Sequence, residues 1–590
     1  MKIFSKLVIL IAPITVFALA GCAKDSTDEL TSGVAASSTS SSGTTTVSGA
    51  TTDGDVSSFC IALDTTSLSE TLAVDASDDD YIANTTFGDT VYVNFSTTGA
   101  ATVTGDSKGY VTVSGNDVTV KNTGSTVILY MLSGTTTDGF FKLYSDKKQA
   151  IQLNGANITN PDGAAINNQS KKRTFIVLTA GTKNYLADGT TYTDATTDED
   201  MKGTIFSEGQ LIVNGKGYLQ IDANAKAGIN SDDYVRFMPQ TNVYVDASGG
   251  NGIRGKDKVQ VTGGVINVNV TGAADKGISS DCTVQIDGGR TTILTSGATA
   301  YDSDDKEYKG CAGVKADTLF TISGGKLFCK STGAGGKGIS SDIYAKFLGG
   351  EVKVITTGKE ANDVSPKGIK ADSQIYFNGG STQVRVSGSE GIESKNTLTV
   401  DAGDVEVYAY DDGINSSSDL TINGGYIYSH AINNDGIDAN GNLYINGGVV
   451  IAEGAGTPEC GLDADEQHAY YQNGGVVVAI GGNIQPTASS SKQASVTASV
   501  SSNTTIALLS GTTAILAYKT PSGNGTSLMI STPSLSSGSS YSLLTGCTVT
   551  GGTSFYGLTT GGTVSGTTAS SLTAALQVGS SMGGGGGRPW

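Results

Sequence analysis

Acidic residues recur at fixed places in a phrase that the chain repeats, Gly-Ile-x-Ser/Ala. The C-terminal copies carry a carboxylate or a carboxamide just before the glycine or just after the isoleucine. If the copies stack as strands, these groups lie about 5 Å apart from one copy to the next. Carboxylates that close repel one another, so a cation is expected among them, and oxygen ligands favour Ca²⁺ over zinc or copper. The residues expected to bind calcium are Asp411, Asp412, Asn415, Asp435, Asp438, Asp463 and Asp465.

A solvated acidic face with diffuse counterions is the alternative interpretation of this column. The middle copies favour calcium, because their acids have lysines beside them, as in Lys315 with Asp317 and Lys370 with Asp372. Such pairs neutralise each other locally. The lysines disappear where the acids accumulate, which leaves the C-terminal acids in need of another cation.

A second set of residues could bind sugar. The strands that follow the Gly-Gly pairs are rich in tyrosine, and tyrosines on adjacent coils would form a platform for stacking against sugar rings. An arginine one coil away could meet a uronate carboxylate. The alternative is that tyrosine simply favours exposed strand positions. The residues expected to contact carbohydrate are Tyr408, Tyr410, Tyr426, Tyr428, His430 and Arg385; the spacing fixes no acid partner that would make His430 a catalytic base.

The repeat itself predicts the elements that must position these residues. Ten copies occur about every 23 residues between Gly228 and Gly475, and a fixed period of this length indicates a solenoid. Within a copy, apolar and polar residues alternate, as in Leu420-Thr421-Ile422, which is typical of short strands. The sequence therefore predicts an all-β fold, a parallel β-helix with the isoleucines of Gly-Ile in one buried column. The asparagines before Gly-Gly should form a structural hydrogen-bonded ladder at Asn378, Asn423, Asn446 and Asn473.

The ends of the chain differ in composition from the repeats. An apolar run after Lys2 and Lys6 ends in Leu19-Ala20-Gly21-Cys22, which resembles a bacterial lipoprotein signal with Cys22 as the lipidated residue; an ordinary signal peptide or a membrane helix is the alternative. The protein is then expected at the outer membrane or cell surface, held only by its lipid. The predicted regions are a signal peptide (1–22), a flexible tether (23–57), an N-terminal β cap with first coils (58–163), the β-helix (164–484), a β-sandwich-like module (485–578) and a glycine-rich tail (579–590).

Charge and cysteine spacing exclude two classes of partner. The formal net charge of -19 argues against nucleic acid, which attracts lysine and arginine. The cysteines show no Cys-x-x-Cys spacing, so no zinc cluster is expected. The sequence leaves the oligomeric state and the disulfide pairing open.

The ordered motifs resemble those of the cellulose- and polygalacturonate-binding β-helix proteins known as carbohydrate-binding domain-containing proteins. The resemblance covers about residues 80–485 and includes Asp412-Gly413-Ile414-Asn415-Ser416, Asp435-Gly436-Ile437-Asp438-Ala439, Leu153-Asn154-Gly155-Ala156, Gly163-Ala164-Ala165-Ile166, Asn184-Tyr185-Leu186 and Phe206-Ser207-Glu208-Gly209-Gln210-Leu211. It implies a right-handed parallel β-helix, similar to pectate lyases, with Ca²⁺ held by turns matching Asp412, Asn415, Asp435, Asp438 and Asp463. Arg254 and Glu393 depart from the pattern.

The sequence and the resemblance together predict a lipid-anchored protein that binds plant-type polysaccharide, cellulose or polygalacturonate, along a calcium-stabilised β-helix. One alternative is a Ca²⁺-dependent polysaccharide lyase, which would need a lysine or arginine base, with Arg385 and Lys395 as candidates. A non-catalytic adhesin or surface stalk is the other. Hydrolysis is not favoured, because a ladder of many similar acids does not single out two.

Overall fold

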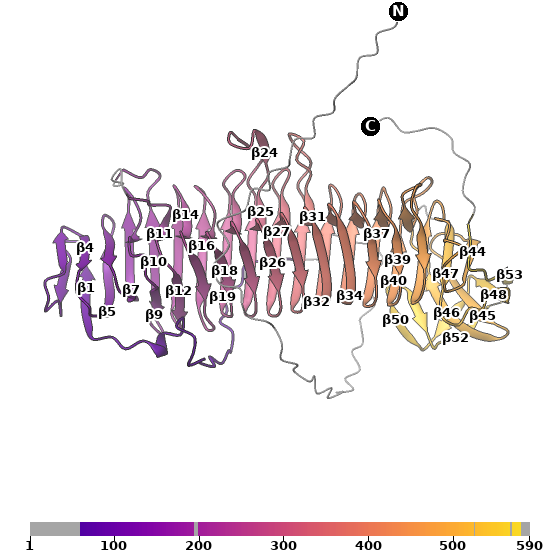
Figure 1. The fold of residues 1–590 in the computed structure, drawn as a ribbon, viewed down its shortest axis with the longest axis horizontal. Coiled ribbons are helices and arrows are strands. Elements are labelled where there is room, and N and C mark those ends of the chain that lie inside the picture. Colours follow the sequence, from indigo (N-terminus) through magenta and orange to yellow (C-terminus); the bar gives the residue numbers. More distant parts are fainter. Residues whose placement is uncertain (1–59, 194–198, 524–525, 567–568, 580–590) are drawn as a thin grey trace, which may run out of the picture. The chain divides into compact units, whose positions relative to one another are not determined.

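The computed structural model describes residues 60–193, 199–523, 526–566 and 569–579 (Figure 1). The signal peptide with Cys22, the tether and residues 580–590 of the tail lie outside these residues. Within them, the chain forms strands and the 3-10 turn Ile82–Asn84. The described part has no helix long and apolar enough to span a membrane.

Two sheets run through the coils. The first has 15 strands and holds the Gly-Ile phrases, so we call it the Gly-Ile sheet. Apart from the terminal pair β3–β4, its neighbouring strands are parallel, and most join one coil to the next. Its strands are β3 (Val111–Ser114), β4 (Asp117–Asn122), β6 (Phe140–Ser145), β8 (Ile166–Asn168), β11 (Gly203–Ser207), β14 (Ala227–Ser231), β17 (Ile253–Gly255), β20 (Lys276–Ser280), β25 (Ala312–Ala316), β28 (Lys337–Ser341), β31 (Lys367–Ala371), β33 (Ile392–Ser394), β35 (Ile414–Ser416), β38 (Ile437–Ala439) and β41 (Leu462–Ala464).

The second sheet, here called the long sheet, has 28 strands, and most repeated coils contribute two strands to it on either side of a Gly-Gly turn. Its N-terminal half includes β1 (Asp89–Phe95), β2 (Thr102–Thr104), β5 (Ile128–Thr136), β7 (Gln149–Asn160), β9 (Thr174–Leu178), β10 (Lys183–Asp188), β12 (Leu211–Gly215), β13 (Tyr218–Ala223), β15 (Tyr234–Phe237), β16 (Asn242–Ala247), β18 (Lys258–Val261), β19 (Val265–Val270), β21 (Thr283–Ile286) and β22 (Arg290–Thr295). It continues with β26 (Leu319–Ile322), β27 (Lys326–Ser331), β29 (Tyr344–Phe347), β30 (Glu351–Thr356), β32 (Gln374–Val386), β34 (Thr397–Ala409), β36 (Leu420–Ile422), β37 (Tyr426–Ala431), β39 (Leu443–Ile445), β40 (Val449–Glu453), β42 (Tyr470–Gln472) and β43 (Val476–Gly481).

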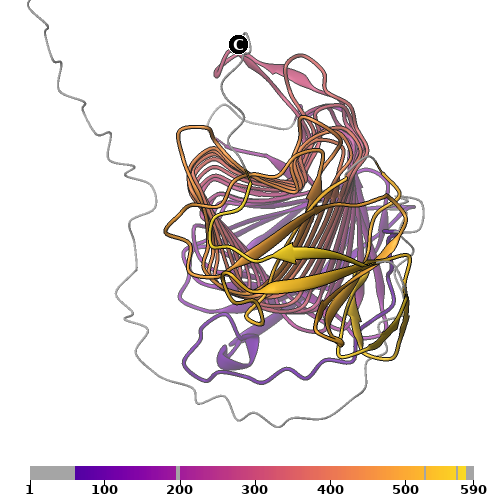
Figure 2. The ribbon, with the colours of Figure 1, turned by 90° about the vertical axis from the view of Figure 1, so that its right-hand side faces the viewer.

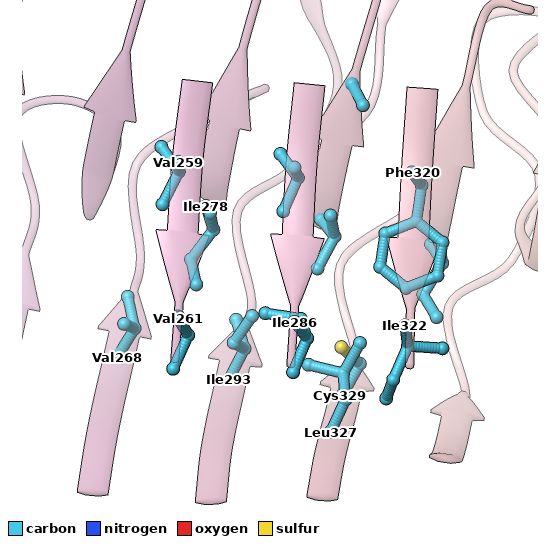
Figure 3. Packing of buried hydrophobic residues seen from close by; sticks show 14 of the residues in the cluster. Val259, Val261, Val268, Ile278, Ile286, Ile293, Phe320, Ile322, Leu327 and Cys329 are labelled. Atoms are coloured by element: carbon cyan, nitrogen blue, oxygen red, sulfur yellow. The ribbon is translucent and has the colours of Figure 1, made fainter. Parts of the chain in front are cut away.

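The predicted register of the repeats is confirmed. Ile414 on β35 pairs with Ile437 on β38, and Ile437 pairs with Leu462 on β41. All three side chains are buried. Figure 3 shows the same arrangement farther back along the stack, where residues such as Ile278 and Ile293 fill the core. Each such aliphatic side chain contributes about 1.5–3 kcal/mol by leaving water, and their repetition accounts for the parallel β-helix.

The glycine of each Gly-Ile phrase is required by close packing between coils. A Cβ atom on Gly413 would lie 2.0 Å from Ser429 Oγ and 2.5 Å from the Gly436 carbonyl oxygen. The second glycine of the Gly-Gly turns has a different role, because Gly425 and Gly448 adopt φ of 86° and 83°, a region that side chains disfavour. The first glycine therefore allows adjacent coils to pack closely, and the second allows the backbone to form the Gly-Gly turn.

The predicted asparagine ladder is present and gains one acidic member. Asn446 Nδ2 donates to Asn423 Oδ1 at 2.8 Å, and Asn473 Nδ2 donates to Asn446 Oδ1 at 2.9 Å. In the coil between those of Asn378 and Asn423, the ladder residue is Asp401. Its carboxylate accepts hydrogen bonds from both asparagines at 2.8 Å. The ladder therefore links five successive coils along the turn.

An N-terminal strap, residues 60–84, contacts strands far along the stack. Arg236 Nη1 on β15 lies 2.7 Å from Asp78 and 2.9 Å from Asp80, although Asp78 precedes it by 158 residues. Farther along, the backbone N–H of Gly264 donates to the carboxylate of Glu70. The sequence did not predict this strap.

The C-terminal residues end the parallel stack. β47 (Ser527–Ser531) pairs antiparallel with β43 and also with β44 (Ser495–Ser499). A six-stranded sheet follows, here called the C-terminal module, and the end-on view of Figure 2 shows these segments in yellow in front of the coils. Its strands are β45 (Thr505–Ser510), β46 (Thr513–Lys519), β48 (Ser540–Thr545), β50 (Thr553–Phe555), β51 (Leu558–Thr560) and β53 (Ala569–Thr573), with β49 (Thr548–Thr550) and β52 (Thr563–Ser565) as a separate pair.

Candidate functional site

Three of the predicted calcium ligands converge at the C-terminal end of the Gly-Ile sheet. Asp438 on β38 pairs in register with Asp463 on β41, and Asp435 precedes β38 by two residues. One carboxylate oxygen from each of the three lies within 4.8 Å of the others. We call these residues the acidic triad. Asp435 is buried, and the other two are half-buried.

Hydrogen bonds fix the carboxylates around the triad. Asn415 Nδ2 donates to Asp412 Oδ2 at 3.0 Å and to Asp438 Oδ2 at 3.2 Å. Asp412 also accepts from the backbone N–H of Asp435 at 3.0 Å, and Asp435 accepts from the backbone N–H of Cys460. Asp412 and Asn415 therefore orient the triad from the preceding coil.

Burial disfavours the charged forms of these acids. It raises the pKa of Asp412 to about 7 and that of Asp463 to about 6. Burial, reinforced by neighbouring carboxylates, raises the pKa of both Asp435 and Asp438 to about 8. A bound cation would offset both the cost of burying these charges and the repulsion between the carboxylates. Because every converging side-chain donor is oxygen, the set suits a hard ion such as Ca²⁺.

Asp411 and Asp465 lie outside the acidic triad. Asp411 accepts a hydrogen bond from Asn434 Nδ2 at 3.0 Å, and burial raises its pKa. Asp465 accepts from the backbone N–H of Gln467 at 2.8 Å. Both carboxylates thus have local protein partners, and neither contributes to the group of oxygens within 4.8 Å.

Lysines neutralise the acids of the middle coils, as predicted. Lys315 Nζ lies 3.1 Å from Asp317, and Lys370 forms an ion pair with Asp372. At the boundary with the acidic coils, Lys367 pairs with Glu390 and lies 3.3 Å from Glu393, which Lys395 also contacts at 2.6 Å.

A second acidic group was missed by sequence reasoning. Asp200, Glu208 and Asp232 also bring carboxylate oxygens within 4.8 Å of one another. Lys202 Nζ lies 2.8 Å from Asp200 and 2.7 Å from Asp232, so this group already contains a cation. The three acids occupy different positions relative to the Gly-Ile phrase in neighbouring coils. The repeat therefore gave no reason to expect them close together.

The predicted tyrosine platform is not one open surface, because the C-terminal module covers Tyr408 and Tyr428. Tyr408 and Tyr428 are only 7% and 6% exposed. The ring of Tyr428 stacks on Tyr556 of the module, with centroids 4.2 Å apart and planes at 13°. Of the predicted tyrosines, Tyr410 and Tyr426 are exposed, and Tyr426 packs edge-on against Phe555 at 5.5 Å.

Arg385 and His430 also belong to this covered interface. Arg385 pairs with Glu406 and lies 4.0 Å from the centroid of the Tyr408 ring, so its guanidinium does not face solvent for a uronate. His430 Nδ1 lies 2.7 Å from Glu453 Oε2. The acid partner that spacing alone did not fix is therefore Glu453, which is buried.

Another aromatic pair escaped the sequence analysis. Tyr444 on β39 and Tyr471 on β42 are adjacent in register, with ring centroids 4.8 Å apart and planes at 7°. The sequence does contain a signal for this pair, because each tyrosine stands two residues before an asparagine of the ladder. The two rings stack on each other and so stabilise neighbouring coils. Each ring covers the facing side of the other, and that side is not available to a ligand.

The model of a family described as carbohydrate-binding domain-containing protein matches residues 114–274 and 329–409. A relative with the same description, from Acetivibrio thermocellus, is 28% identical over 134 residues, which are 22% of this chain and 46% of the relative. The chain thus spans about half the length of that relative. The chain is also similar to a solved structure, a gadolinium derivative of a polysaccharide lyase-like protein from C. thermocellum. The match has 22% sequence identity and a TM-score of 0.31, and it covers 48% of this chain and 95% of the chain in that structure. The resemblance to the carbohydrate-binding domain-containing family is confirmed.

Proposed function

We propose that this chain, two segments of which match a carbohydrate-binding family, is a polysaccharide-binding protein built on a calcium-stabilised β-helix. The observation that carries the proposal is the position of the match. Residues 114–274 and 329–409 are coils of the solenoid, so the family likeness lies in the repeated fold and not in an appended module. A stack of similar coils presents outward side chains at intervals of about 4.8 Å, which suits a polymer with a repeating unit.

Ca²⁺ is the cation we assign to the acidic triad. Asp435, Asp438 and Asp463 would supply carboxylate oxygens, and Asn415 and Asp412 would hold these ligands in place. The ion would neutralise repulsion between coils, so its role is structural. Both matched segments end before these residues, so the calcium proposal stands on the geometry of this chain alone.

We further propose cellulose or polygalacturonate as the polymer and the outer membrane or cell surface as the location. Cys22 would carry the lipid, and the tether after it would hold the β-helix away from the membrane. The net charge of -19 disfavours nucleic acid as a partner. Binding without catalysis is favoured over the lyase alternative, because both predicted bases are engaged: Arg385 with Glu406, and Lys395 with Glu393.

Co-sedimentation with insoluble cellulose and affinity electrophoresis in polygalacturonate test the proposal. We expect retention by at least one polymer, with no new ultraviolet absorbance from unsaturated sugar ends. Retention together with that absorbance would identify a lyase instead. A protein retained by neither polymer would refute the binding proposal.

Calcium is tested separately by calorimetric titration of the EDTA-treated protein. The variants are Asp435→Asn and, as a matched control, Asp342→Asn, whose acid pairs with Lys315 on a middle coil. We expect calcium binding in the wild type and the control and its loss in Asp435→Asn. Equal binding by all three proteins would place the ion elsewhere.

A further inference from the structure

We propose that Lys326, Lys330 and Lys353, grouped around Phe328, form a binding patch for an anionic polysaccharide with uronate carboxylates. We call these four residues the lysine patch. The inference rests on the proposed polysaccharide-binding function and chooses between its candidate polymers. It also supplies a partly exposed face on the long sheet, whereas Tyr408 and Tyr428 of the predicted tyrosine platform are buried.

Strand alternation places the patch on the outer face of the long sheet. On β27, Leu327 and Cys329 are buried in the core, as Figure 3 shows, so Lys326, Phe328 and Lys330 point away from it. Phe328 pairs in register with Lys353 on β30. The residues therefore come from two adjacent coils, whose strands are about 4.8 Å apart.

Ion pairing organises the patch but leaves it with an excess of positive charge. Lys326 Nζ and Lys353 Nζ lie 2.7 and 3.0 Å from the two oxygens of Glu351. Lys353 Nζ also lies 5.5 Å from the centroid of the Phe328 ring. The patch and Glu351 together carry three cations and one anion, in a chain whose net charge is -19. An anionic ligand would find this face favourable although the protein as a whole is acidic.

The patch lies between two covered stretches of the same sheet. On one side, Arg290, the register neighbour of Lys326, pairs with Asp64 of the N-terminal strap at 3.0 Å. On the other side, the C-terminal module packs over Tyr408 and Tyr428. The side chains of β27 and β30 remain partly exposed between these covers, with Lys326 the most open.

The chemistry of these groups selects a polyuronate over a neutral glucan. Each lysine ammonium carries N–H donors and a positive charge, both of which a carboxylate can accept in a charge-assisted hydrogen bond. The half-exposed ring of Phe328 offers an apolar surface to the C–H groups of a sugar. A single exposed ion pair is weak, but a polymer that presents a carboxylate on each sugar can engage several lysines at once. Cellulose is uncharged and cannot form ion pairs with the lysines.

The test measures affinity for soluble polygalacturonate and for the neutral hydroxyethyl cellulose, using the full chain. The patch variant is Lys326→Gln/Lys330→Gln/Lys353→Gln. Its control, Lys108→Gln/Lys171→Gln/Lys226→Gln, removes the same charge from exposed lysines elsewhere. We expect the patch variant to lose about tenfold or more in polygalacturonate affinity and the control less than about twofold. Binding by the wild type should also weaken with added NaCl.

The outcomes separate this inference from the proposed function. Equal losses in the two variants would mean that net charge, not the patch, attracts the polymer, and would overturn the inference. Binding of hydroxyethyl cellulose alone would overturn it as well, while polysaccharide binding would stand. Failure to bind either polymer would remove both proposals. A triple lysine-to-arginine variant that retains affinity would support the patch, because it keeps the charge and changes the side chains.

Discussion

Glu453 and His430 form a contact beneath the C-terminal module, with His430 Nδ1 2.7 Å from Glu453 Oε2. The same carboxylate accepts hydrogen bonds from the hydroxyls of Tyr428, at 2.9 Å, and Tyr518. Tyr518 belongs to β46 of the module, whereas the other residues belong to the coils. One buried acid therefore joins the module to the β-helix, and the first prediction concerns it.

Replacing Glu453 should loosen the module. The substitution Glu453→Gln removes the charge that strengthens these hydrogen bonds and is expected to cost about 2–3 kcal/mol of unfolding free energy. Urea denaturation followed by tyrosine fluorescence measures the change. Glu307→Gln, on an exposed hairpin, is the control and should alter stability by less than about 0.5 kcal/mol. Similar values for the two variants would contradict a role for Glu453 in holding the module.

Calcium should stabilise the protein through the acidic triad. At a calcium concentration 100 times the dissociation constant, binding to the native state adds about 2.7 kcal/mol, and EGTA should remove that gain. Asp438→Asn should make the calcium-free protein more stable, because it relieves repulsion at a partly buried position, yet should abolish the response to calcium. Thermal unfolding with and without calcium measures both effects. A variant whose melting temperature still rises with calcium would exclude the triad.

Lys337 should make stability depend on pH. Burial, with the nearby Lys370 as a smaller cause, lowers the pKa of its ammonium from 10.5 to about 8. Between these values the unfolded chain binds a proton that the folded chain has released, so this residue makes stability increase as pH rises from about 8 to about 10.5. The substitution Lys337→Met should therefore stabilise the protein at pH 7, by on the order of 1–3 kcal/mol.

Denaturation of wild type and Lys337→Met across that pH range measures this effect. The advantage of the variant should shrink toward pH 10.5 and vanish there. Lys108→Met, at an exposed position, should show no such trend. A constant difference between Lys337→Met and wild type at all pH values would mean that packing, not protonation, explains it.

Gly413 should not tolerate even a methyl group. Its Cβ would approach the backbone oxygen of Gly436 to 2.5 Å and Ser429 Oγ to 2.0 Å, so two coils would have to separate. We expect Gly413→Ala to lower the unfolding free energy by at least about 2 kcal/mol. Gly99→Ala has nothing within 4 Å of the new methyl group and serves as the control. Circular dichroism during thermal unfolding distinguishes them, and equal melting temperatures would refute the close-packing explanation.

Much of the fold and part of the site could be predicted from sequence because the coils are equivalent. The recurring Gly-Ile phrase, spaced 23 residues from Ile414 to Ile437 and 25 residues from Asp438 to Asp463, aligns each of these pairs without any knowledge of other contacts. The same equivalence predicted the asparagine ladder. Asp401 was missed because the Gly-Gly phrase is altered in that coil, although its carboxylate accepts the hydrogen bonds of the ladder.

What covers each face was decided only in the tertiary structure. Alternation correctly showed that Tyr408 and Tyr428 leave the core, but it holds no information about residues that pack on them from outside. The C-terminal module has its own strand pattern and follows no period, so the stacking of Tyr556 on Tyr428 had no signal in the sequence. The strap is similar, because Asp78 reaches Arg236 across 158 residues. Periodicity determines contacts within the repeat, whereas contacts between the repeat and its two ends depend on how unlike surfaces fit together.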